Sequence, residues 1–314
     1  MKHRGYTRSM VAAARFGLTA SVMLIALTFS AAVAVAGEAA AGEAGPENVT
    51  APPRSFDLTI GAAAGYGPVA KGVNAAQPLF MPHIEARLGR RVVVGTDGLA
   101  VRLVGVPRGA PSAAAAAGGE GSAAAAGAGA GAPGAPPVVR LTARLLPNLG
   151  RYDEHLPEDY EGIGDVPMTA EAGLDVGVRL WKNLEATGMF AVDILDRGHR
   201  GSRVAMGARW NGMLRRLGVR CAVGVDVVAA TPDYMESYYG VSGKQASRTR
   251  FDTYDPGAGF AAARAMFTLA MPLGRRVTVA SESTVTSFVG EARNSPLVQS
   301  SEQGASQLVL VYRL

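Results

Sequence analysis

The chain has 314 residues, with 31 Lys and Arg against 26 Asp and Glu and a formal net charge of +5. Four of the bases precede the first acid, Glu38, so the rest of the chain carries a net charge of only +1. This balance removes the argument for a nucleic-acid-binding surface. The single cysteine, Cys221, excludes a disulfide framework.

The N-terminus predicts export. Lys2, Arg4, Arg8 and Arg15 form a basic region, and an apolar run follows that ends on Ala34-Val35-Ala36. A basic start, an apolar centre and a small-residue end are typical of a signal peptide, which we expect to span 1–36 and to be cleaved after Ala36. An uncleaved membrane anchor is the alternative, because roughly 20 apolar residues can cross a bilayer.

Two segments of low complexity follow. Residues 37–54 are rich in Ala, Gly, Glu and Pro and predict a disordered N-terminal segment. Residues 107–137 are dominated by Ala and Gly and have almost no apolar bulk to bury. We interpret this tract as a flexible insertion within one domain that spans 55–314.

Apolar and polar residues alternate with a period of two through that domain. Between Ala170 and Leu180, for example, every second residue is apolar, and the others are Glu, Gly, Asp, Gly and Arg. Such a period indicates strands, because residues two apart lie on nearly opposite sides of a helix. About 12 strands are predicted, over 56–66, 80–88, 91–96, 99–106, 138–146, 170–180, 184–194, 203–210, 217–227, 259–271, 276–289 and 303–314.

The connections between these strands alternate in length. Short links at 181–183, 212–216 and 272–275 alternate with long ones, and Asp97-Gly98 is typical of a tight hairpin turn. Bacterial outer-membrane barrels have an even strand count, short periplasmic turns and long external loops. The sequence therefore predicts an all-β fold, an antiparallel up-and-down transmembrane β-barrel in the cell outer membrane, surrounded by lipid and lipopolysaccharide. A soluble β-sandwich is the alternative.

The polar faces of the predicted strands carry both charges in similar numbers. A barrel of about 12 strands is narrow, so Arg and carboxylate side chains would cross-link its interior. We expect an interior stabilised by ion pairs, and the alternative is a narrow channel or small-solute porin. The predicted charge network comprises Glu85, Arg87, Glu171, Asp175, Arg179, Arg209, Arg220 and Asp226.

The pattern for catalysis is weak. His199 and Ser202 are close in sequence within one external loop, which makes an outer-membrane hydrolase the least favoured hypothesis. The acidic stretch 153–165 offers oxygen ligands for a divalent cation, but its spacing matches no calcium loop. No zinc spacing and no phosphate-binding glycine loop occur, so we predict no enzyme activity, metal or cofactor.

An unusual external loop contains three tyrosines. Asp233, Tyr234, Tyr238 and Tyr239 lie just after a predicted strand end. Aromatic residues at that level suit either an interfacial aromatic belt or a contact surface for a partner. The sequence leaves both interpretations open, and these four residues are the candidate interaction loop.

An ordered set of short motifs resembles the MipA/OmpV family of outer-membrane proteins, the MltA-interacting protein family. The resemblance covers most of residues 55–314, with 107–137 as an apparent insertion and a last residue, Leu314, that is not aromatic. Its motifs are Thr96-Asp97-Gly98-Leu99, Gly162-Ile163-Gly164-Asp165-Val166, Tyr238-Tyr239-Gly240-Val241-Ser242, Tyr254-Asp255-Pro256-Gly257-Ala258-Gly259 and Asn294-Ser295-Pro296-Leu297-Val298.

The resemblance implies a non-enzymatic barrel that acts as a scaffold or interaction protein. Its implied partners are a murein transglycosylase and a murein synthase, and an envelope-stress role is also implied. No catalytic residue is carried over.

Overall fold

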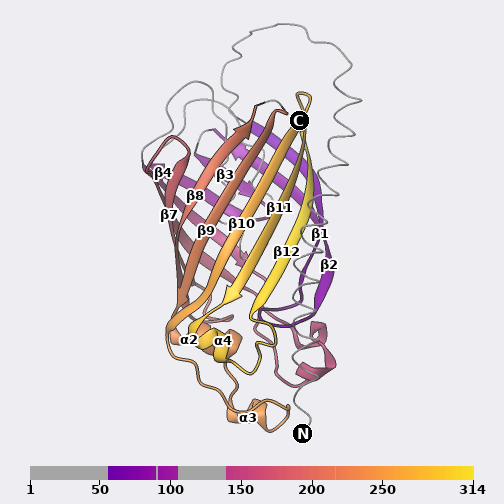
Figure 1. The fold of residues 1–314 in the computed structure, drawn as a ribbon, viewed down its shortest axis with the longest axis vertical. Coiled ribbons are helices and arrows are strands. Elements are labelled where there is room, and N and C mark those ends of the chain that lie inside the picture. The colour runs from indigo at the N-terminus through magenta and orange to yellow at the C-terminus, as the bar shows by residue number, and fades with distance from the viewer. Residues whose placement is uncertain (1–55, 90, 105–138, 216) are drawn as a thin grey trace, which may run out of the picture.

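The computed structural model describes residues 56–89, 91–104, 139–215 and 217–314 (Figure 1). Twelve strands dominate the described residues. They are β1 (Phe56–Pro68), β2 (Ala76–Leu88), β3 (Val92–Gly95), β4 (Gly98–Val104), β5 (Val139–Asn148), β6 (Thr169–Arg179), β7 (Leu184–Asp193), β8 (Ser202–Leu214), β9 (Val219–Ala230), β10 (Gly259–Leu273), β11 (Val277–Phe288) and β12 (Glu302–Arg313).

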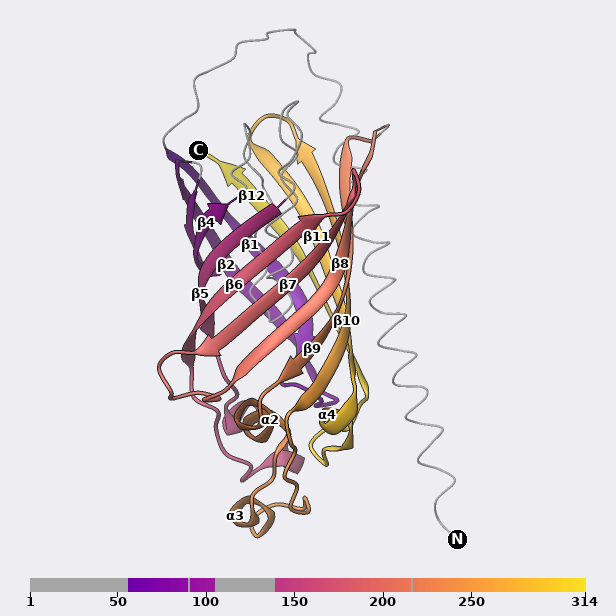
Figure 2. The ribbon, with the colours of Figure 1, turned by 90° about the vertical axis from the view of Figure 1, so that its left-hand side faces the viewer.

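The strands form a closed antiparallel barrel in which each strand pairs with its neighbours in sequence. The first and last strands close the ring, with a register that runs from Thr59 opposite Arg313 to Tyr66 opposite Ser306. The predicted up-and-down barrel of about 12 strands is therefore confirmed. The tilt of the strands against the barrel axis is visible in two perpendicular views (Figures 1 and 2).

The outer surface of the barrel is apolar. On β9, for example, Val223, Val225 and Val227 are exposed, while the residues between them face inward. Alternation of this kind places apolar side chains in lipid and polar ones in the lumen. Among the described residues, no helix is both long and apolar enough to cross a membrane. At the end of the chain, Leu308, Leu310, Tyr312 and Leu314 are all exposed on the outer face.

The two ends of the barrel differ. Both ends of the described chain, Phe56 and Leu314, belong to the end with the short turns, which is periplasmic in barrels of this kind. The predicted Asp97-Gly98 hairpin between β3 and β4 turns on the side away from that end, within the barrel wall. Gly98 has a φ of +105°, and a Cβ there would lie 2.0 Å from the Leu145 carbonyl oxygen. Only glycine fits this position.

The long external connections contain helices that the strand pattern did not predict. They are α2 (Pro232–Tyr239), α3 (Gly243–Ala246) and α4 (Gly290–Asn294), together with 3₁₀ turns at Asp153–His155 and Glu158–Tyr160. α2 begins with Pro232 after Thr231, and proline is favoured in a first helical turn because its missing N–H would have no partner there. α2 and α4 lie directly beneath the external end of the barrel (Figure 1).

Ion pairs line the inner wall of the barrel, and each joins side chains of one strand or of strands that lie close together in the sheet. Arg264 binds Asp226 through two nitrogens, each 2.8 Å from a carboxylate oxygen, and Arg87 lies 2.6 Å from Glu85. Further pairs join Arg140 to Glu185 at 3.1 Å, Arg313 to Asp57 at 2.8 Å, and Arg144 to Asp175. Small apolar residues fill the space between these pairs in two clusters, one of which is Ala63, Ala270, Ala280, Val309 and Val311.

Three expectations lie outside the described residues. They concern the signal peptide at 1–36, the N-terminal segment at 37–54 and the insertion at 107–137.

The outer face of β9 predicts that the cost of a charged substitution depends on its depth in the membrane. Replacing Val225 with Arg, at mid-strand on the outer face, should cost about 2–4 kcal/mol of unfolding free energy, whereas Leu217→Arg, at the short-turn end, should cost about 0–1 kcal/mol. Urea unfolding in lipid vesicles measures both, with Val225→Leu as the matched control. Equal costs at the two positions would contradict the assignment of the outer face to lipid.

Candidate functional site

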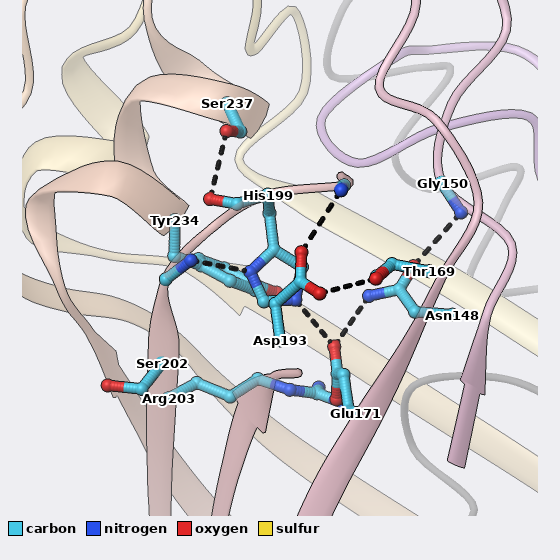
Figure 3. A network of polar contacts seen from close by, with 12 residues as sticks. Asn148, Gly150, Thr169, Glu171, Asp193, His199, Ser202, Arg203, Tyr234 and Ser237 are labelled. Atoms are coloured by element: carbon cyan, nitrogen blue, oxygen red, sulfur yellow. Dashed lines mark hydrogen bonds and ion pairs between the residues drawn. The ribbon is translucent and has the colours of Figure 1, made fainter. Parts of the chain in front are cut away.

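The most ordered polar site lies at the external mouth of the barrel, where the β7–β8 loop (194–201) enters the lumen (Figure 3). The carboxylate of Asp193 accepts hydrogen bonds from the backbone N–H groups of Leu195, Asp196, Gly198 and Arg200, at 3.0–3.1 Å. The Thr169 hydroxyl donates a further bond to it. These bonds fold the loop around one carboxylate, although Asp196 and Arg200 adopt left-handed backbone angles of +51° and +56°.

The folded loop carries His199 onto Glu171 of β6. Glu171 is fully buried, and its Oε1 lies 2.8 Å from His199 Nε2 and 2.6 Å from the donating amide of Asn148. Its second oxygen accepts a 2.8 Å bond from Arg203 Nη2. A buried carboxylate requires compensation of this kind, since an isolated charge in a low-dielectric interior is very costly.

The hydrogen bonds of His199 define its tautomer. Its Nδ1 accepts a 3.2 Å bond from the backbone N–H of Gly201, so the ring proton lies on Nε2 and is donated to Glu171. Both ring nitrogens are therefore engaged. The Ser202 backbone N–H instead donates to the Thr231 hydroxyl, and the Ser237 hydroxyl donates to the His199 carbonyl oxygen. Within the described residues, no Ser–His dyad of the kind a hydrolase needs is formed.

α2 covers this cluster and is bonded to it. The Tyr238 hydroxyl donates to Asn148 Oδ1 at 3.1 Å, and Arg151 Nη1 donates to the Tyr238 carbonyl at 3.3 Å. The Tyr234 ring packs edge-on against the His199 ring, with centroids 4.8 Å apart. Gly201 permits this approach, because a Cβ there would lie 2.5 Å from the backbone nitrogen of Tyr234.

Lys71, from the β1–β2 loop, fixes the same helix from the other side. Its Nζ donates a 2.6 Å hydrogen bond to the Tyr234 hydroxyl and lies 3.0 Å from the centroid of the Tyr238 ring. A cation over a desolvated aromatic face contributes roughly 2 kcal/mol. The helix is thus held by loops from β1, β5 and β7, whose residues lie far apart in the sequence.

A second, outer layer covers α2. Tyr160, Ile163, Phe251, Leu297 and Val73 form a buried apolar cluster built from four different external connections. The Tyr160 hydroxyl donates to the Leu297 carbonyl at 2.6 Å. Burial raises the pKa of Tyr160 and lowers the pKa of the Arg151 guanidinium. The external mouth is therefore closed by two packed layers of side chains.

The tyrosines of the candidate interaction loop lie neither in an interfacial aromatic belt nor on an exposed contact surface. Tyr234, Tyr238 and Tyr239 are only 2–4% exposed, inside an apolar cluster with Met235 and Phe288. Side chains so buried cannot form a lipid-facing belt or a partner surface in this conformation, so both expectations are corrected. Among the four candidates only Asp233 is exposed. The helical period explains the difference, because it turns 234, 235, 238 and 239 to one face.

The predicted charge network divides into separate units. Glu85 pairs with Arg87, Asp226 with Arg264 and Asp175 with Arg144, whereas Glu171 belongs to the His199 cluster. Arg209 is buried opposite Glu185 in the β7–β8 register. No ion pair joins Arg179 or Arg220 to another described residue. Sequence reasoning missed Lys71, Asn148, Arg151 and Arg203 as partners of the site.

The acidic stretch 153–165 forms the rim of an external pocket of about 590 Å³, lined by Asp153, Glu154, Glu158, Glu161 and Asp165 among others. Asp165 and Asp153 accept hydrogen bonds from the backbone N–H groups of Asp153 and Gly162, respectively. Within the described part of the chain, no group of three or more His, Cys, Asp or Glu side chains is placed to hold a metal ion.

Replacing Glu171 with Gln tests whether this cluster holds α2. Removing one partner from a buried ion pair costs about 3–5 kcal/mol, because the remaining charges lose their compensation. We expect backbone amides of 194–201 and 232–239 to exchange hydrogen faster in the variant, as measured by mass spectrometry. Asp226→Asn, which breaks a lumen pair remote from α2, is the control. Unchanged exchange of α2 in Glu171→Gln would contradict this role.

Comparisons with solved structures give only distant likenesses. The chain is similar to the COG4313 outer membrane channel from Pseudomonas putida F1, with 14% identity, 87% of this chain and 100% of that chain covered, and a TM-score of 0.38. It is also similar to the outer membrane channel DcaP of Acinetobacter baumannii, with 8% identity, 82% and 96% covered, and a TM-score of 0.34. These values carry no argument about function.

The family comparison is specific. No curated protein matches the chain. The family model described as MltA-interacting protein MipA matches residues 60–314, which is the whole barrel except the start of β1. The chain therefore belongs to the MipA family, as the ordered motifs predicted.

Proposed function

We propose that this chain is a non-enzymatic outer-membrane barrel that acts as an interaction protein and exposes its partner surface on the periplasmic side. The observation that carries the proposal is the closed external mouth. α2 and the outer cluster of Tyr160, Ile163 and Phe251 cover it. Hydrogen bonds from the Tyr238 hydroxyl to Asn148 and from Lys71 to the Tyr234 hydroxyl hold the cover in place. Such a barrel is poorly suited to free diffusion of solutes, so its surfaces are left to carry the function.

The periplasmic rim supports a partner on that side. Every short turn carries exposed basic residues and no acid among the described residues 89, 91, 181–183, 215, 217–218 and 274–276. The exposed bases are Arg91, Lys182, Arg215, Arg275 and Arg276. A rim of one charge steers association with a surface of opposite charge, which in this compartment means an acidic protein or polymer.

The family description suggests which partner this is. Its printed name, MltA-interacting protein, refers to contact with another protein. We propose by analogy that this chain binds a murein transglycosylase, and with it a murein synthase, through the basic rim. The analogy is at the level of family and fold, so the assignment depends on a direct test.

A narrow channel for small solutes is the second candidate. The observation in its favour is two buried polar atoms of inward-facing side chains, Arg209 Nη1 and Glu282 Oε1, which have no hydrogen-bond partner among the described residues. Charged atoms without protein partners in a lumen are satisfied by water. This arrangement admits water and small ions, whereas the covered mouth opposes their passage.

Photocross-linking in living cells tests the partner surface. A photoreactive amino acid at Lys182 or Arg275, on the periplasmic turns, should capture a partner, and the same group at Lys244, exposed on external α3, should not. Reversing charge with Lys182→Glu and Arg275→Glu should reduce capture from a third rim position, Arg215. Mass spectrometry identifies the adduct.

Equal capture from Lys244, or none from the rim, would contradict the proposal of a periplasmic partner. Capture of a protein unrelated to murein would remove the murein assignment and leave the interaction role.

A further inference from the structure

The barrel wall has a missing section between β2 and β5. The β3–β4 hairpin fills only the part of this space nearest the short-turn end, since β3 pairs with β2 only from Glu85 to Leu88. Likewise, β4 pairs with β5 only from Leu141 to Leu145, so the rest of β5 toward the external end has no partner in β4. Within the described residues, β2 from Ala76 to Ile84 therefore has a strand partner on one side alone, β1. We call this missing section the wall window.

The sequence of β2 places prolines at positions whose backbone N–H groups would otherwise point into the window. The Ile84 carbonyl accepts a 3.0 Å bond from the Thr96 N–H, so the even-numbered residues of β2 direct their backbone groups toward the window. Pro78 and Pro82 are both even-numbered. They therefore remove two N–H donors from the open edge. Proline is confined to edge strands for this reason.

The opposite side of the window has the same property. On β5 the Leu145 carbonyl points toward β4, because a Cβ on Gly98 would lie 2.0 Å from it. Pro147 lies two residues beyond Leu145, past the last residue of β5 that pairs with β4. Its backbone nitrogen therefore points into the window, as the Leu145 carbonyl points toward β4. Three prolines thus flank the window from two strands. An edge with so few donors cannot template an added peptide strand, which needs alternating donors and acceptors.

The strand beside the window is apolar on both faces. In Pro78-Leu79-Phe80-Met81-Pro82 the even residues face outward, with Phe80 76% exposed, and Leu79 and Met81 face the lumen. Elsewhere on β2 the inward residues are polar or charged, as with His83, Glu85 and Arg87. Leu79 and Met81 keep partial exposure and belong to none of the apolar clusters of the described residues.

We propose that the wall window binds a hydrocarbon chain of a membrane lipid, which enters from the surrounding leaflet and lies against Leu79 and Met81. At ordinary strand spacing, three intervals of about 4.8 Å separate β2 from β5, or roughly 14 Å, which is wide enough for an acyl chain. Covering apolar side chains that water would otherwise contact favours this binding. Phe80 and Ile84 are exposed on the outer face of β2 beside the window, so this side of the window faces lipid.

Quenching of tryptophan by brominated lipid tests this proposal. In full-length protein with Trp181→Phe and Trp210→Phe, single tryptophans are placed at three positions. Met81→Trp faces the lumen at the window. Thr284→Trp also faces the lumen, but on β11, which is paired on both sides there. Phe80→Trp reports lipid on the outer face. Each protein is refolded into phosphatidylcholine vesicles with brominated acyl chains, and heat-modifiable gel migration confirms the barrel.

We expect quenching of Met81→Trp to approach that of Phe80→Trp and to exceed that of Thr284→Trp several-fold. Lengthening the β3–β4 hairpin by four residues in each arm, with Pro78→Val, Pro82→Val and Pro147→Val to restore donors, should close the window. In this background Met81→Trp should fall to the level of Thr284→Trp.

Two results would overturn the proposal. One is quenching of Met81→Trp by brominated lipid no greater than that of Thr284→Trp. The other is quenching of Met81→Trp by aqueous acrylamide in place of brominated lipid, which would show that the window holds water.

Discussion

The structure depends on one constraint, that a backbone in hydrocarbon must satisfy its own hydrogen bonds. Strands meet this constraint only when the sheet closes, as β1 does on β12. Successive side chains of a strand point to opposite faces, so closure turns one face of every strand to lipid and the other to a narrow lumen. The wall window between β2 and β5 is the section in which the ladder is incomplete, and three prolines reduce the number of donors left open there.

The narrow lumen has a second consequence, because charges inside it must be compensated. Where the neutralising partners lie on adjacent strands, as with Arg264 and Asp226, the compensation is local. At the external mouth, the groups that compensate a buried charge come from segments far apart in the sequence. Glu171 is satisfied by a histidine from the β7–β8 loop and by an amide from β5, and the same amide accepts a bond from α2. A single buried carboxylate thus fixes the positions of three external segments.

The strands could be predicted from the sequence because each carries its own signal. Alternation in Ala170–Leu180 or Val219–Val227 is a local property, and the Asp97-Gly98 turn fixes the register of its hairpin. The ordered motifs also identified the family. The charges of Glu85, Arg87, Asp226 and their neighbours were assigned to the lumen for the same reason.

The site was less predictable, because its contacts join distant residues. Three tyrosines within six residues indicated a surface, yet the helical turn buries all three, and Lys71, 163 residues away from Tyr234, contacts two of them. Pro232 after Thr231 was a usable helix signal. Nothing local marks Asn148 or Arg203 as partners of Glu171, since their proximity is a product of barrel closure and loop folding.

We assign the function to surfaces because packed side chains cover the external mouth and charged side chains paired along the wall line the narrow lumen. Single-channel recording of the full-length protein in a planar bilayer at high salt tests this claim most directly. The closed mouth predicts no conductance steps after insertion is confirmed by heat-modifiable migration. Regular, reproducible steps of an open pore would contradict it and would establish the channel instead.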